Sequence, residues 1–262
     1  MQNIDPILFL EPILAIVMSI VAVAYWQKRR GFRGIVLLLS FVAYASAIAA
    51  KTAIQAFTLD GVVKFFGSMS IGLGLYYGLQ TVALEVGLAY VLSLYGVRRM
   101  NQKSSDGVPF GISLAFWENG VLLGLLSLFD LAVLYFLLAS GTELAQTIYS
   151  QTVASHSGYF LPPAALLPSV LLGTLERVSS MLAHTAWGAL CVYAAVTGRK
   201  RFLAYALPMG MVDALVPFAS LNITVFEVSV FLLSVGFVLV AWRVAKKVQS
   251  VAGTSLPCTP PC

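Results

Sequence analysis

Charged residues are scarce in this sequence. Asp, Glu, Lys and Arg make up 10% of the 262 residues, whereas hydrophobic residues make up 59%. A soluble domain usually has about 25% charged residues, so this chain cannot cover a water-facing surface. We therefore expect an integral protein of the cell membrane, with the lipid bilayer as its main surroundings. The net charge of +5 does not indicate a nucleic-acid partner, because the basic residues lie in short loops between apolar runs.

Cysteine and histidine are also rare. Three cysteines are too few for a disulfide framework. Two of them, Cys258 and Cys262, lie in a Pro/Cys-rich tail over residues 251–262, where a disulfide pairing, a lipid attachment and no role at all are open. There are two histidines, and His156 falls in a predicted external loop. The membrane part therefore has only His184 to offer as a histidine ligand.

The apolar runs predict an all-α bundle with about seven transmembrane helices, forming one membrane domain over residues 1–250. The fourth run is long enough to be either one tilted helix or a short helix followed by a span. A polar loop over residues 141–167 separates the fourth and fifth spans. The predicted spans cover about 7–26, 34–57, 70–97, a stretch within 109–140, 168–197, 202–218 and 223–242.

The basic residues set the predicted orientation of the bundle. Thirteen of the 16 Lys and Arg residues lie in the loops at 27–33, 98–108 and 198–201 and in the tail from 243. With seven spans, all four segments fall on one side of the membrane. By the positive-inside rule we expect the N-terminus outside and the C-terminus, with its tail, in the cytoplasm.

Ionisable residues inside the spans are costly in hydrocarbon and by default face a protein interior or a water-filled cavity. Glu85, Glu118, His184 and Asp213 lie on four different spans, roughly 14–20 Å from the cytoplasmic ends at about 1.5 Å per residue. They share one level near the middle of the membrane. Lys51 is set aside, because it lies near the predicted outer end of the second span. The full set inside the spans is Glu11, Glu85, Glu118, Asp130, Glu176, Arg177, His184, Asp213 and Glu227.

Two interpretations of this polar set are open. In one, it is a network that fixes helix packing: Arg177 pairs with Glu176 or Asp213, and His184 hydrogen-bonds to a carboxylate. In the other, it is a metal or proton site. Glu176, Arg177 and His184 could all reach one cavity from the same helix. A divalent metal such as zinc would be held by His184, Asp213 and Glu118, with Glu85 as the general base.

Four short segments resemble the motifs of the YhfC branch of the intramembrane metalloprotease superfamily, which also includes PrsW-type and CAAX-processing proteases. Together they cover residues 81–217. The segments are Leu84-Glu85-Val86-Gly87 before a helix that ends in Arg98-Arg99, Phe116-Trp117-Glu118-Asn119-Gly120, Glu176-Arg177 with His184 eight residues after the glutamate, and the run from Leu207 to Asp213.

The resemblance implies a membrane-embedded metallopeptidase that hydrolyses a peptide or membrane-protein substrate. It implies catalytic roles for Glu85 and Glu118, metal binding by His184, Asp213 and Glu118, and supporting roles for Glu176, Arg177 and Asn119. Three departures from the pattern oppose this activity. Leu84 stands where the first glutamate of the motif belongs, Leu88 stands near where an arginine would follow, and Met209 stands where the last histidine belongs.

Three functions follow as hypotheses from these residues. The first is a metallopeptidase-like protein that has diverged or lost activity. The second is a non-catalytic scaffold or substrate-binding subunit of a membrane complex, which Leu84 and Met209 favour. The third is a small proton-coupled transporter that uses the carboxylates at mid-membrane.

Overall fold

The computed structural model describes residues 3–31 and 33–253, and these residues contain helices and no strand. Cys258 and Cys262 lie outside this part of the chain, so their role stays open. The helices are η1 (Pro6–Phe9), α1 (Leu10–Arg30), α2 (Gly34–Phe66), α3 (Ile71–Gln80), η2 (Thr81–Val86), α4 (Gly87–Met100), η3 (Ser104–Asp106), α5 (Gly107–Ala115), η4 (Phe116–Leu125), α6 (Leu126–Ala139), α7 (Glu143–His156), η5 (Ser157–Phe160), α8 (Pro163–Thr197), α9 (Lys200–Ala206), η6 (Leu207–Phe218) and α10 (Ile223–Gly253).

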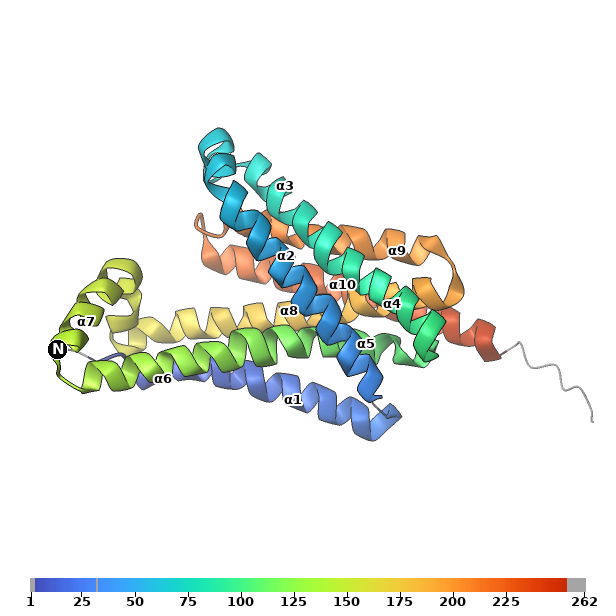
Figure 1. Cartoon of the computed structure of the whole chain (residues 1–262), viewed down its shortest axis with the longest axis horizontal. Helices are drawn as coiled ribbons and strands as arrows, with labels where there is room; N and C mark the ends of the chain where they lie inside the picture. The colour runs from blue at the N-terminus through green and yellow to red at the C-terminus, as the bar shows by residue number, and fades with distance from the viewer. Residues whose placement is uncertain (1–2, 32, 254–262) are drawn as a thin grey trace, which may run out of the picture.

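Seven helical stretches are long and apolar enough to cross a membrane, which confirms the predicted all-α membrane bundle. Several consecutive helices join end to end within one span. The fourth span is one continuous stretch from Ser104 to Ala139, which resolves the alternative of two separate helices. The loops with the basic residues lie at one end of the bundle, and α7 and the N-terminus lie at the other (Figure 1).

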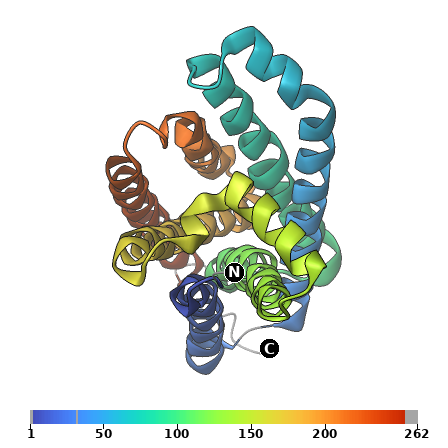
Figure 2. The ribbon, with the colours of Figure 1, turned by 90° about the vertical axis from the view of Figure 1, so that its left-hand side faces the viewer.

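Two boundaries differ from the sequence prediction. The second span does not end near residue 57, because α2 continues to Phe66 and places Lys51 well inside the helix. The predicted loop over 141–167 contains α7, whose first turn is capped by the Thr142 hydroxyl. Figure 2 shows α7 lying across that end of the bundle. The fifth span begins at Pro163 rather than near 168, since proline is well tolerated in a first helical turn.

The long helix α8 forms the centre of the bundle. It packs against α10, α5, α4, α9 and α1. Its C-terminal half is almost continuously buried from Ala183 to Ala195. Contact with α5 is close because both helices have glycine at the crossing. A Cβ on Gly188 would lie 2.6 Å from the Cα of Gly111. Small residues of this kind let helix backbones approach each other in a membrane, where van der Waals packing drives association.

A second close contact places the helices that contain the acidic residues. The α3–η2 stretch packs along η6, and a Cβ on Gly78 would lie 3.0 Å from the Met211 methyl group. In Figure 1 the α2 and α3–α4 pair runs at an angle to α8. Together these contacts bring α2, η2, η4, α8 and η6 around one interior space.

Candidate membrane-embedded site

The three acidic residues predicted as catalytic or metal-binding lie on helical segments that are not α-helical. Glu85 lies on η2 and Glu118 on η4, and both segments are π-helical. Asp213 lies on η6, a 3-10 helix. A π-helical turn has an extra residue, which shifts the direction of the side chains that follow, and such turns are frequent at functional sites. The three carboxylates are thus placed where helix geometry departs from the standard form.

Lys51 joins two of these carboxylates. Its Nζ lies 2.6 Å from Glu85 Oε1 and 3.0 Å from Asp213 Oδ2, and it also donates to the Thr81 hydroxyl at 2.7 Å. Thr81 in turn donates to Asp213 Oδ2 at 2.5 Å. A half-buried cation with hydrogen-bonded partners on two helices compensates the negative charge of both carboxylates.

His184 lies between Glu85 and the third carboxylate, Glu118. Its Nε2 is 3.3 Å from Glu85 Oε2, and its Nδ1 is 2.9 Å from Glu118 Oε2. The ring is 5% exposed and packs against Trp187, with 4.2 Å between ring centroids. Glu85 therefore connects the lysine and the histidine through its two oxygens, one to each partner.

Ser180 extends this network to Asn119. The Ser180 hydroxyl donates to Glu118 Oε2 at 2.8 Å and accepts from Asn119 Nδ2 at 3.1 Å. It also lies 3.2 Å from His184 Nδ1, one helical turn away on α8. Asn119 is fully buried, so its contact with the network is made through Ser180.

A cavity of about 170 Å³ opens beside the network. All four residues predicted to share one level, together with Lys51 and Glu176, line it. Its remaining walls come from α8, η6 and α10 and combine serines with apolar side chains. These further lining residues include Ser179, Ser180, Ala183, Trp187, Val212, Val216, Phe226, Val230 and Ser234.

Arg177 does not join this cavity. Its guanidinium pairs with Glu176 and approaches Glu11 Oε1 at 4.0 Å, and it lines a second pocket between α1, α6 and α8. Neighbouring residues on an α-helix point about 100° apart, and Glu176 and Arg177 line different pockets although their side chains pair at the boundary between them. The expectation that carboxylate, guanidinium and imidazole share one cavity is therefore not met for the guanidinium.

A comparison with family models found a match to the YhfC intramembrane metalloprotease over residues 14–246. This match covers most of the chain. The chain belongs to the YhfC family. Comparisons with curated proteins and with solved structures found no match. YhfC membership agrees with the bundle of seven apolar helices, and the family name suggests a metal cofactor.

The described side chains of this YhfC chain do not form a metal centre as they are arranged. Within residues 3–31 and 33–253, no three His, Cys, Asp or Glu side chains are placed to hold one ion. Both nitrogens of His184 lie against carboxylate oxygens, and the Lys51 ammonium lies between Glu85 and Asp213. Catalytic zinc sites use three neutral or anionic ligands with one open position. The Lys51 ammonium among these carboxylates would repel a metal ion bound beside it.

The two residues that replace a glutamate and a histidine of the family motifs have apolar side chains, and the structure does not place a polar group at either position. Met209 is buried at 3% exposure within the main core, and Leu84 is next to Glu85 on η2. Neither supplies a donor atom suited to zinc. The residue that sequence reasoning missed is Lys51. Its signal was a single lysine within an apolar run that continues on both sides.

Proposed function

We propose that this YhfC-family chain binds a segment of a membrane peptide or protein in the cavity beside Glu85 and His184, and does not hydrolyse it with a metal. One observation carries this proposal: Lys51 is ion-paired with both Glu85 and Asp213. The carboxylate assigned as general base is thereby neutralised by a residue of the chain itself. Leu84 and Met209, in place of a glutamate and a histidine, support the same conclusion.

The shape and lining of the cavity support a protein-derived occupant. A volume of about 170 Å³ suits one side chain or a short stretch of backbone rather than a whole helix. A neighbouring apolar pocket of about 230 Å³ lies between η6 and α10, and Phe226 lines both spaces. A segment with one polar group among apolar ones would match this pair of spaces. Buried polar side chains of the site would then find partners on the occupant.

Photo-crosslinking tests this proposal. A benzophenone amino acid at Phe226 should form a protease-sensitive adduct with a polypeptide in membranes. Val216→Trp, which enlarges a half-exposed side chain at the cavity, should abolish the adduct, because the indole occupies the same space. Val228→Trp is the matched control, since Val228 is 44% exposed and does not line either pocket.

Two results would contradict the proposal. An adduct that is insensitive to Val216→Trp is not in the cavity. The length of the captured polypeptide is also compared between the protein with Glu85 and its Glu85→Gln variant. A shorter polypeptide in the protein with Glu85 would show peptide-bond hydrolysis at this site. In that case the metallopeptidase hypothesis is correct, and the pairing of Lys51 has to be released during turnover.

A further inference from the structure

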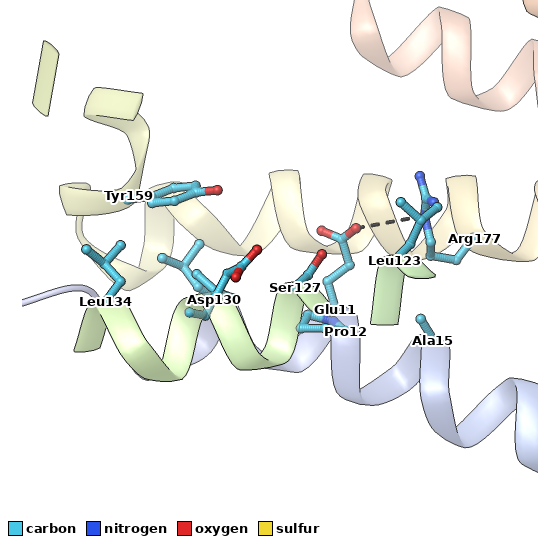
Figure 3. Close-up of a pocket in the computed structure, with 11 residues that line it drawn as sticks. Glu11, Pro12, Ala15, Leu123, Ser127, Asp130, Leu134, Tyr159 and Arg177 are labelled. Carbon is cyan, nitrogen blue, oxygen red and sulfur yellow. Dashed lines mark ion pairs between the residues drawn. The ribbon is translucent and has the colours of Figure 1, made fainter. Parts of the chain in front are cut away.

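A second pocket, of about 330 Å³, lies between α1, α6 and α8 and has no part in the site beside His184. Its polar lining comes from four helices: Glu11 from α1, Ser127 and Asp130 from α6, Tyr159 from η5, and Arg177 from α8 (Figure 3). Leucines from η1, η4 and α6 supply much of the apolar wall. The sequence assigned none of these residues except Arg177 to a site.

The pocket lies at the end of the bundle that the basic loops place outside. Arg177 is 20 residues from Thr197, the end of α8, which is about 30 Å along the helix and close to the thickness of a bilayer core. Tyr159 belongs to the connection that follows α7, which lies across this end (Figure 2). The pocket is therefore at the membrane–water interface, within reach of both lipid headgroups and solutes.

Oxygen atoms dominate the polar part of the pocket. Figure 3 shows the Asp130 carboxylate, the Ser127 hydroxyl and the Glu11 carboxylate facing one space, with the Tyr159 hydroxyl directed towards it. Within the described residues, the side chains of Asp130 and Ser127 have no partner in the chain. The Glu11 carboxylate lies directly against Gly173 of α8, where a Cβ would overlap it. Two carboxylates and two hydroxyls are a set of acceptors for a cation.

An independent observation at the inner end of the pocket also indicates a ligand. Arg177 is only 9% exposed, and its Nε–H has no hydrogen-bond partner in the described chain. The nearest acceptor, Glu11 Oε1, is 4.0 Å away, too far for a hydrogen bond. Buried donors are nearly always paired, so an unpaired donor beside a pocket indicates that an acceptor oxygen is missing from its surroundings.

We propose that this pocket binds a primary amine that also carries an acceptor oxygen. The ammonium lies between Asp130, Ser127 and Glu11, the oxygen accepts from Arg177, and the connecting carbon chain lies against the leucines. Three N–H donors of an ammonium match carboxylate and hydroxyl acceptors from separate helices. A bare metal ion does not match, since the space is much larger than an ion.

Such a group can come from the ethanolamine headgroup of a lipid or from a free amine in the external medium. The experiment uses the full chain in phosphatidylcholine nanodiscs, titrated with 5-amino-1-pentanol by calorimetry. Two matched compounds each lack one group: 1,5-pentanediol has no ammonium, and pentylamine has no oxygen. We expect the diol to bind at least tenfold more weakly than the amino alcohol. We expect pentylamine to bind several-fold more weakly than the amino alcohol.

Variants locate the binding in the pocket. Asp130→Asn should weaken amino alcohol binding about tenfold, because a charge-assisted hydrogen bond is replaced by a neutral one. Ser127→Ala should weaken it several-fold, and this milder change keeps the test valid if the charge variant folds poorly. Asp60→Asn is the control, since Asp60 is exposed on α2 and does not line the pocket.

The outcomes separate the two sources of the amine. If phosphatidylethanolamine in the nanodiscs lowers the apparent affinity for the amino alcohol in the wild type and not in Asp130→Asn, the occupant is the headgroup. If it has no effect on wild-type binding, the occupant is a free amine. The proposal is overturned if the diol binds as tightly as the amino alcohol, if no saturable binding occurs, or if both Asp130→Asn and Ser127→Ala bind like the wild type.

Discussion

The ammonium of Lys51 lies 2.6 Å from one carboxylate oxygen of Glu85, and the other oxygen of that carboxylate lies 3.3 Å from His184 Nε2. One glutamate thus connects a lysine on α2 with a histidine on α8 across the middle of the bundle. The remaining members, Glu118, Asp213 and Ser180, attach to this central link. The stability of the bundle and the character of the site therefore depend on the same contacts.

Lys51→Met should destabilise the protein strongly. Removal of one partner of a buried ion pair leaves uncompensated charge and costs roughly 3–5 kcal/mol. The measurement is reversible unfolding in detergent, with Lys64→Met as the control, because Lys64 is exposed near the end of α2. Combining Lys51→Met with Glu85→Gln and Asp213→Asn should recover much of the loss. Equal stability of the two lysine variants would contradict the assigned pairing.

Ser180→Ala should cost roughly 1–3 kcal/mol, which is typical when buried polar partners are left unsatisfied. The hydroxyl serves both Glu118 and the buried Asn119, whose Oδ1 already has no partner in the described residues. Ser179→Ala is the matched control. Ser179 is the more buried of the two serines, and its hydroxyl donates only to the Leu175 carbonyl of its own helix. Thermal unfolding of the two variants separates the contribution of the network from the general effect of losing a serine hydroxyl. A larger loss of stability for Ser179→Ala than for Ser180→Ala would contradict our assignment.

Gly111→Ala should destabilise the chain, whereas Gly236→Ala should be neutral or stabilising by up to about 1 kcal/mol. Alanine has the higher helix propensity at both positions. A Cβ at residue 111 would overlap the backbone of Thr185 on α8, whereas one at residue 236 meets nothing within 4 Å. Comparing the melting temperatures tests the close α5–α8 contact. If both substitutions raise the melting temperature, α5 and α8 do not approach each other closely at Gly111.

Zinc should not stabilise the purified protein. A ligand that binds only the folded state raises the melting temperature with its concentration, so a real zinc site would produce such a shift. We expect no shift with zinc or with a chelator, because Lys51 lies among the carboxylates that would have to bind the ion. The control is His184→Ala under the same conditions. A zinc-dependent rise in the wild type that disappears in this variant would establish a metal centre and refute the assigned role of Lys51.

The seven spans and the family were accessible from the sequence, because long apolar runs and the short motifs around Glu85, Glu118, His184 and Asp213 are local features. The outside position of the N-terminus stays a prediction. The partner of Glu85 was not accessible. Lys51 looked like a residue near a helix end, since the apolar run weakens after residue 57, and only the full length of α2 places it in the interior.

Other features of the site depend on packing between helices, which the sequence of a single helix does not determine. The π-helical turns at Glu85 and Glu118 change which way the side chains point, and residue type alone does not specify them. The separation of Glu176 from Arg177 into two cavities depends on the positions of α1 and α10 against α8. Spacing along one helix predicts a shared face, but the neighbouring helices decide what that face meets.

The length of α2 has a consequence for the host membrane. Its 33 residues extend about 50 Å, whereas the bilayer core is about 30 Å thick. A helix this long fits by tilting or by extending past the lipid, and α2 is inclined to α8 in Figure 1. Thicker or thinner membranes favour different inclinations. Lys51 links this inclined helix to η2 and η6, so a change in its inclination would also move Lys51 relative to Glu85 and Asp213.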